Sequence, residues 1–242
     1  MMGALAEKFP EIVRRVISLG HEVASHGHDH LLVFRLLPEE FRRDTERSKG
    51  LLEDLAGKQV SGYRAPEFSI RKQALWALDI LAELGFRYDS SIIPIHHRRY
   101  GIPGFSPEIT RYTFPSGREI IEFPLSTFPI GRMRFPVAGG GYIRFMPARL
   151  VRRVVEKMNS RQLPMVTYFH PYEFDTNRLD AFETMMPVDV TQRLRGWSLN
   201  FHQNFRRRTV SHKVRTLLGS FLFTGFEEYL RNREIHECSS LF

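Results

Sequence analysis

The chain of 242 residues contains one cysteine, Cys238, so an internal disulfide is excluded and nothing requires an oxidising compartment. No apolar run is long enough to span a membrane, and no internal repeat or low-complexity tract is present. Residues 1–8 lack the charged, apolar and small-residue order of a secretory signal. These absences predict a cytoplasmic protein.

Basic residues are in excess, but no nucleic-acid-binding motif accompanies them. The net charge is +8, and the densest basic stretch is Arg206–Arg208. Because basic charge alone is weak evidence for nucleic-acid binding, we expect no nucleic-acid partner. A solvated basic face is the simpler interpretation. The alternative is a peripheral contact with an anionic membrane or an acidic glycan.

Helix, glycine and strand follow one another three times in the first 95 residues. Apolar spacing and glycine stops predict helices over 9–17, 41–55 and 72–84, and strands over 21–25, 59–63 and 86–92. This order predicts parallel βα units in a barrel or a wound sheet. Further along, we expect strands at 119–125 and 165–169, and helices from Pro147, before Leu218 and at 226–230. No element is predicted between Asn177 and the helix before Leu218.

Two histidines follow the first predicted strand at a spacing that suits a metal ion. His26 and His30 are four residues apart, so their rings share one face if the chain coils there. Arg64 and His170 also follow predicted strands. Because the ends of parallel strands converge, these side chains are expected near one another, and His170 becomes a candidate general acid.

Six segments in this order resemble the polysaccharide deacetylases with a NodB-like domain, carbohydrate esterase family 4. Within that family, the chain is similar to the branch found in bacterial exopolysaccharide loci. The segments are Gly20–His30, Gly62–Ile70, Trp76–Pro94, Tyr100–Pro103, Gly139–Arg144 and Tyr168–Asp175. The resemblance implies an α/β fold, a distorted (β/α) barrel of NodB type without its first strand or strands. Residues 1–110 would form the NodB-like segment, and residues 111–242 a family-specific segment that completes the same domain.

The resemblance also implies roles for individual residues. His26 and His30 match two metal ligands of the family, with zinc as the expected metal and cobalt, nickel or iron as alternatives. Arg64 matches an arginine that holds the catalytic carboxylate. His170 matches the histidine that protonates the leaving amine.

Other side chains near these motifs have more ordinary expected roles. Pro66 and Tyr142 are candidate substrate contacts, and Tyr142 could stack on a sugar ring. His28, between the two ligand positions, is expected to be structural or to support the ligands. Trp76 has helical apolar neighbours and is expected in the core rather than at a sugar.

One part of the family pattern has no counterpart in the sequence as given. The family opens with a strand that ends in two acidic residues, a metal ligand and the catalytic base. Two histidines alone leave a catalytic zinc under-coordinated, and general-base help is worth about 10²–10⁴-fold in rate. Arg64 is then expected to lack its carboxylate partner, which is costly for a buried guanidinium.

The sequence predicts a metal-dependent deacetylase that hydrolyses N-acetyl groups of amino-sugar polymers in exopolysaccharide or cell-envelope metabolism. A polysaccharide or oligosaccharide is the expected partner. The first alternative is a catalytically inactive relative that binds glycan or a protein partner, which the missing acidic pair favours. The second is an amide hydrolase of the same fold that acts on small cyclic imides or ureides.

Overall fold

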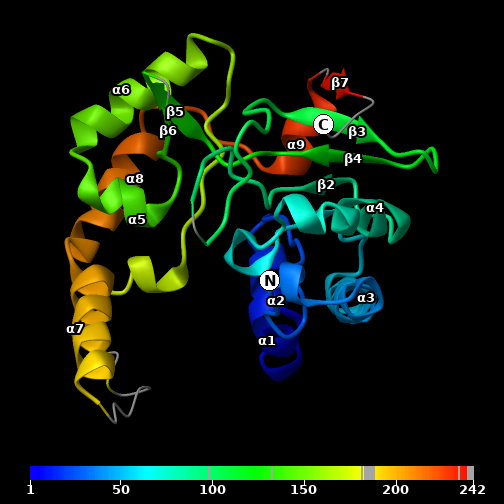
Figure 1. The fold of residues 1–242 in the computed structure, drawn as a ribbon, viewed down its shortest axis with the longest axis horizontal. Helices are drawn as coiled ribbons and strands as arrows, with labels where there is room; N and C mark the ends of the chain where they lie inside the picture. Colours follow the sequence, from blue (N-terminus) through cyan, green and yellow to red (C-terminus); the bar gives the residue numbers. More distant parts are fainter. Residues whose placement is uncertain (98, 132, 181, 183–188, 234, 239–242) are drawn as a thin grey trace. The chain divides into compact units, whose positions relative to one another are not determined.

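The computed structural model describes residues 1–97, 99–131, 133–180, 182, 189–233 and 235–238. The chain forms two compact units. Unit 1 comprises Met1–Pro136 and Thr224–Phe242, and unit 2 comprises Val137–Phe223. The chain thus leaves unit 1 after the sixth strand and returns to it for the last helix and strand (Figure 1). The division of the sequence at residue 110 stays a prediction.

Unit 1 combines an open sheet with helices. Its α-helices are α1 (Gly3–Lys8), α2 (Pro10–Ser18), α3 (Pro38–Ala56), α4 (Trp76–Glu83) and α9 (Phe226–Arg231). Its strands are β1 (Gly62–Tyr63), β2 (Tyr88–Asp89), β3 (Thr110–Thr113), β4 (Glu119–Glu122), β5 (Thr127–Ile130), β6 (Met133–Pro136) and β7 (His236–Cys238). Short 3-10 turns are η1 (Val33–Arg35), η2 (Pro66–Phe68) and η3 (Lys72–Ala74).

The main sheet has the strand order β1-β2-β4-β3-β7, and β5 pairs with β6 as a separate antiparallel hairpin. Strands β1, β2 and β4 are mutually parallel, whereas β3 runs antiparallel to β4. Ser25 extends the parallel part by a single bridge to Tyr63. The described strands form an open sheet rather than a closed barrel, which agrees with the predicted distorted α/β fold.

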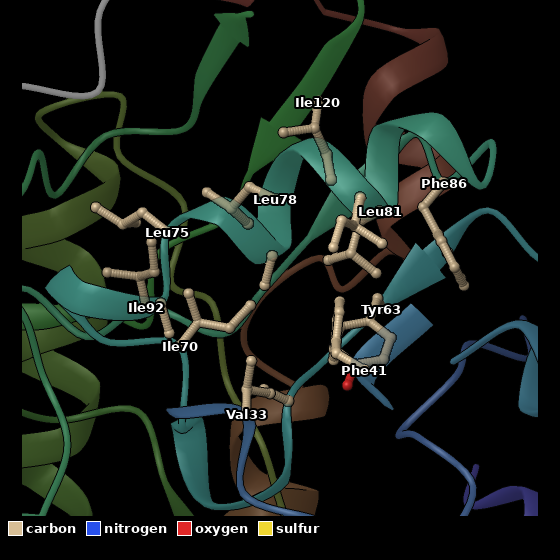
Figure 2. Packing of buried hydrophobic residues seen from close by; sticks show 14 of the residues in the cluster. Val33, Phe41, Tyr63, Ile70, Leu75, Leu78, Leu81, Phe86, Ile92 and Ile120 are labelled. Carbon is tan, nitrogen blue, oxygen red and sulfur yellow. The ribbon is translucent and has the colours of Figure 1, made fainter. Parts of the chain in front are cut away.

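The core of unit 1 lies between the sheet and the helices on one of its faces. Figure 2 shows Leu78 and Leu81 of α4 packed over Ile120 of β4, with Phe41 of α3 beside Tyr63. Burying a side chain of this size stabilises the fold by about 1.5–3 kcal/mol. Trp76 packs against the same cluster, edge-on to Phe41 at 5.6 Å between ring centroids, so its predicted core position is confirmed.

The opposite face of the sheet is covered by α9. Ile120 and Ile121 point to opposite faces because side chains alternate along a strand. Tyr88, which is in register with Ile121, contacts Phe226 of α9 with ring centroids 5.2 Å apart. Helix α9, near the end of the chain, therefore packs in the same unit as the first residues.

Helix α3 shows how local sequence sets the bounds of an element. Proline at the first helical position suits its start, and the Glu40 carboxylate accepts a hydrogen bond from the Leu37 N–H at 2.8 Å. Its buried residues are Phe41, Thr45, Ser48 and Leu52. Gly57 ends the helix at φ 62°, a left-handed conformation that glycine adopts without strain.

Unit 2 is helical where it is described. It contains α5 (Gly140–Phe145), α6 (Ala148–Asn159), α7 (Val190–Asn204) and α8 (Val210–Leu218), with 3-10 turns η4 (Pro171–Glu173) and η6 (Arg207–Thr209). Its small core joins Ile143, Val151, Val155 and Leu217. Lys213 of α8 is buried, and its ammonium donates hydrogen bonds to the carbonyls of Ile143, Arg144 and Met146 at 2.7–2.9 Å.

Several predicted strands are shorter in the structure than in the sequence analysis. Residues 21–25 contribute only the bridge at Ser25, and residues 165–169 only the bridge between Tyr168 and Gly139. The apolar runs are real, but each pairs with a neighbour over a single residue, which is too little for a ladder. No described helix is both long and apolar enough to cross a membrane.

Candidate functional site

Three parallel segments of unit 1 end side by side, and polar residues follow each of them. His26 follows the bridge residue Ser25, Arg64 follows β1, and Ser90 follows β2. The Arg64 N–H donates to Ser25 O at 3.0 Å, and the Ser90 N–H donates to Tyr63 O at 3.0 Å. Strand ends of this kind are where ligand sites form in α/β folds, so this edge is the candidate site.

The loop that carries the histidines is held by helix α3. One carboxylate oxygen of Asp44 accepts the His28 N–H at 2.8 Å, and the other accepts the Asp29 N–H at 3.0 Å. Ser48, one turn further along α3, donates its hydroxyl to Gly27 O at 3.1 Å. Gly27 has φ 71°, and a Cβ there would lie 2.9 Å from Asp44 Oδ2. The close approach of this loop to α3 therefore requires glycine.

His26 and His30 lie together, as their spacing predicts. Their ring centroids are 5.2 Å apart at an interplanar angle of 67°. His26 Nδ1 lies 2.6 Å from Arg64 O. Because a carbonyl only accepts, Nδ1 carries the proton and Nε2 keeps its lone pair. Burial lowers the pKa of His26 to about 3, although the hydrogen bond to Arg64 O raises it, so the ring is neutral at pH 7.

His28 points away from this pair and is buried. Its Nε2 lies 3.5 Å from Glu7 and 3.7 Å from Asp29, and a Cβ on Gly3 would overlap its Nδ1 at 2.2 Å. The ring therefore packs against α1. This placement agrees with the structural role expected for it.

Arg64, which was expected to lack its carboxylate partner, is hydrogen-bonded to a serine. Its Nε donates to Ser90 O at 2.8 Å, and its Nη2 donates to Ser90 Oγ at 2.7 Å. Ser90 in turn donates its hydroxyl to Phe123 O at 2.8 Å. The guanidinium also lies over the ring of Phe226, with Cζ 5.8 Å from its centroid. Ser90 at the next strand end and Phe226 of α9 therefore both contact the guanidinium.

Sequence reasoning missed a pair of buried acids beside this network. Asp89 at the end of β2 and Glu122 at the end of β4 are in register, and both side chains are fully buried. Asp89 accepts hydrogen bonds from the backbone N–H and hydroxyl of Ser91, whose hydroxyl oxygen also accepts the Ala65 N–H at 2.7 Å. Glu122 Oε1 accepts the Ile92 N–H at 3.0 Å.

These two acids share one proton. Glu122 Oε2 is buried and finds no donor among the described residues, as expected if a proton rather than a side chain fills that position. Burial raises the pKa of Glu122 well above its usual value, and the neighbouring Asp89 charge raises it further. Burial also raises the pKa of Asp89, while the hydrogen bond from Glu122 lowers it. Glu122 therefore holds the proton and Asp89 the charge.

The loop after β1 is strained. Glu67 and Phe68 have φ of 50° and 54°, in the left-handed region that costs non-glycine residues about 1–2 kcal/mol each. His30 has φ 57°. Such conformations gather at binding and catalytic sites. Pro66 is buried, with Cγ 3.9 Å from where a Cβ on Gly27 would lie, so its part in substrate contact stays a prediction.

The other predicted site residues, His170 and Tyr142, belong to unit 2. The His170 ring is 55% exposed, its Nδ1 lies 3.7 Å from Glu173 Oε2, and its backbone N–H donates to the same oxygen at 2.8 Å. Glu173 thus orients the segment that carries His170. Tyr142 lies in the first turns of α5 and is partly buried. Their predicted roles as acid and substrate contact remain predictions.

The donor set suits a divalent metal only in part. Two imidazoles with ring centroids 5.2 Å apart are appropriate ligands, and the Arg64 carbonyl accepts the Nδ1 proton of His26, a contact of the kind that orients histidine ligands in metal sites. Among the described residues, however, no third histidine, cysteine or carboxylate joins them in a group that could hold a metal. The described residues therefore offer two histidines side by side, whereas a catalytic zinc site needs three protein ligands.

Comparisons with known proteins agree with the resemblance noted in the sequence. The polysaccharide deacetylase family model matches residues 1–88, and the model of a domain of unknown function, DUF3473, matches residues 90–231. The chain therefore belongs to the DUF3473 family, and its first 88 residues carry a polysaccharide deacetylase segment.

Named relatives cover a limited part of the chain. A peptidoglycan deacetylase of Helicobacter pylori is 32% identical over 93 residues, which are 38% of this chain and 30% of that protein. A peptidoglycan-N-acetylglucosamine deacetylase of Bacillus cereus is 31% identical over 80 residues, 33% of this chain and 29% of that protein. The chain thus spans less than a third of the length of these relatives.

The fold is also found in a solved structure. A Mycobacterium smegmatis protein whose crystal structure is assigned to the polysaccharide deacetylases superposes with a TM-score of 0.52 at 23% identity. The superposition covers 70% of this chain and 56% of that chain. At this identity the similarity supports the fold alone.

Proposed function

We propose that the protein is a deacetylase of amino-sugar polymers that uses a divalent metal held by His26 and His30. The observation that carries this proposal is the adjacent pair of imidazoles, His26 and His30, beside Arg64, at the parallel strand ends of the segment that matches polysaccharide deacetylases. Exopolysaccharide or cell-envelope glycan is the proposed substrate, and zinc the proposed metal.

Hydrogen bonds within the chain hold the histidines of this site in position without a substrate. Asp44 fixes the loop that carries both histidines, and Arg64 O fixes the proton of His26 on Nδ1. When bound, the metal would polarise the amide carbonyl and make a water more acidic. Arg64, held by Ser90, presents positive charge at the same strand ends. His170, the proposed donor of a proton to the leaving amine, would hold it on an exposed ring.

Metal binding is the first test. Titration with Co²⁺, followed by its visible absorption bands, should give a saturable signal in the wild type and none in His26→Ala or His30→Ala. His21→Ala is the matched control, because His21 is exposed and lies before the loop. Equal signals in all four proteins would contradict the site.

Turnover is the second test, measured as acetate release from chitin oligomers with metal supplied. No third metal ligand beside the two histidines is found among the described residues, and the sequence as given has no counterpart of the family's acidic pair. We therefore expect slow release, since a general base contributes about 10²–10⁴-fold. A form of the protein that also supplies the family's two acidic residues should release acetate faster. Ring opening of a cyclic imide without acetate release would favour the second alternative. Glycan binding without turnover in both forms would favour the inactive relative.

A further inference from the structure

Unit 2 contains two buried arginines whose nitrogens are not fully hydrogen-bonded. Arg144 in α5 is 5% exposed, and Arg207 in η6 is 3% exposed. Among the described residues, Arg144 Nε and Arg207 Nη1 have no hydrogen-bond partner although both atoms are buried. Buried guanidinium nitrogens are normally satisfied, so these two require an explanation.

The two guanidinium groups lie in one neighbourhood. Arg144 Nη1 donates to Gln203 O at 2.8 Å, at the end of α7 and four residues before Arg207. Both charges act on the phenol of Tyr172: burial and Glu173 raise the pKa of Tyr172, and the two arginines oppose that rise. Both arginines therefore interact electrostatically with Tyr172 of η4.

The nearby carboxylate does not neutralise them. Glu173 Oε2 accepts the His170 N–H at 2.8 Å, and a Cβ on Gly140 would lie 2.1 Å from that oxygen, so Glu173 is held tightly against α5. It forms no ion pair with either arginine. The contrast with Lys213 is direct, since three carbonyls of the same unit accept its three protons.

A cavity lined by aromatic rings and amides lies close by in the chain. It has a volume of about 530 Å³, and its walls combine one basic and one acidic side chain with aromatic rings and amides: Arg178, Asp180, Phe182, Trp197, Asn200, Phe201, Asn204 and Phe205. The Phe205 ring stacks on Phe145, next to Arg144, with centroids 5.1 Å apart, and Phe205 is two residues before Arg207. Aromatic faces beside amide groups suit the apolar faces and hydroxyls of sugar rings.

We propose that Arg144 and Arg207 bind an oxyanion, a carboxylate or a phosphate group, carried by an acidic sugar chain that lies along the α7 cavity. Each guanidinium offers planar N–H donors that match such a group. The oxyanion would accept hydrogen bonds from the unpaired nitrogens and neutralise the excess charge. The sugar part of this inference rests on the proposed function, which it deepens by naming an acidic polymer as the substrate class.

Binding to the full chain tests the proposal, with calorimetric titration and thermal unfolding as readouts. The probes are inorganic phosphate, a uronic-acid oligosaccharide and a neutral chitin oligosaccharide, with sodium chloride at equal ionic strength as the reference. Phosphate and the uronic-acid oligosaccharide should each raise the unfolding temperature saturably, and sodium chloride should not. The uronic-acid chain should bind more tightly than phosphate if the acid is a sugar carboxylate.

The decisive variant is Arg207→Met, with Arg208→Met as the matched control because Arg208 is an exposed neighbour. Arg207→Met should weaken anion binding by about 30-fold, the effect expected when one partner of a buried charge contact is removed. Its unfolding temperature without anion should stay level or rise, because an unpaired buried charge is gone. Arg208→Met should bind as the wild type does. If Arg207→Met does not fold, Arg207→Gln provides the same comparison.

Several results would overturn the proposal. Anions that act no more strongly than sodium chloride, or Arg207 variants that bind with wild-type affinity, would show that no oxyanion site exists. Phosphate that binds more tightly than every sugar acid would remove the sugar from the proposal. These measurements need no turnover, so a failure of acetate release or of Co²⁺ binding leaves their outcome unaffected.

Discussion

Arg64 of unit 1 and the buried Arg144 and Arg207 of unit 2 differ in how their guanidinium nitrogens are hydrogen-bonded. In unit 1, Arg64 has Ser90 as acceptor, and the nearby acids Asp89 and Glu122 share a proton instead of keeping two charges. In unit 2, Arg144 and Arg207 keep unpaired nitrogens in a buried position. Arg64 thus finds acceptors within its own unit, whereas Arg144 and Arg207, like Arg71 and Arg111 of unit 1, each keep a buried nitrogen with no acceptor among the described residues.

The largest expected effect comes from the shared proton of unit 1. The folded-state pKa of Glu122 is raised above its ordinary value of 4.5, so the folded protein keeps a proton that the unfolded chain loses. The resulting stability is fully present below pH 4.5 and is lost as the pH rises through the folded pKa, at up to about 1.4 kcal/mol per pH unit. Glu122→Gln, which stays neutral, should remove this loss.

The measurement is urea unfolding of both proteins from pH 4 to pH 9. Below pH 4.5 the two should be about equally stable, and above it the variant should become progressively more stable. Glu108→Gln, at an exposed acid, should follow the wild-type curve. Parallel curves for the wild type and Glu122→Gln would show that the two acids do not share a proton.

The second effect concerns the loop of the histidine pair. Asp44→Ala removes an acceptor of two backbone N–H groups, and bonds to a charged group contribute about 1.5–3 kcal/mol each. We expect a loss of about 3 kcal/mol in the free energy of unfolding and a parallel loss of Co²⁺ binding. Asp54→Ala on the exposed side of the same helix is the control. Unchanged metal binding would mean that the loop keeps its shape without Asp44.

The sequence was informative where local pattern decides the structure. The apolar spacing around Phe41 and Leu52 predicted α3, and that of Val151 and Val155 predicted α6. Helix α7 was missed because its apolar residues, such as Trp197 and Phe201, are 65% and 60% exposed and do not mark a core face. A helix whose apolar side lines a cavity gives no core signal.

The candidate site was predictable only in part for a similar reason. The spacing of His26 and His30 is local, so their approach could be predicted from it. The pairing of Asp89 with Glu122 depends on the register of β2 against β4, which joins residues 33 positions apart. The partner of Arg64 likewise comes from the next strand. Long-range register therefore decides which polar groups meet, and a local pattern does not contain it.

The two tryptophans provide one reporter for each unit, which allows the comparison to be tested with single substitutions. Trp76 lies in unit 1 and Trp197 in unit 2. In a Trp197→Phe background, the fluorescence of Trp76 reports the unfolding of unit 1 alone. This separation matters because one transition cannot be assumed for a chain with two compact units.

The smallest expected effect comes from removing one hydrogen-bond acceptor of Arg64, which leaves its guanidinium less fully paired, as those of Arg144 and Arg207 are. Ser90→Ala removes the hydroxyl that accepts from Arg64 Nη2 and donates to Phe123 O, at a cost of about 1–2 kcal/mol. Trp76 fluorescence in urea should report this loss, and Ser160→Ala at an exposed hydroxyl should not change it. The sign of the change in the free energy of unfolding is what distinguishes the two arginines. Loss of a partner should destabilise unit 1, whereas loss of the unpaired charge in Arg207→Met should not destabilise unit 2, because only the first arginine has its acceptor within the chain. If Ser90→Ala is neutral, the Ser90 hydroxyl contributes nothing measurable to holding Arg64, and the contrast between Arg64 and Arg207 disappears.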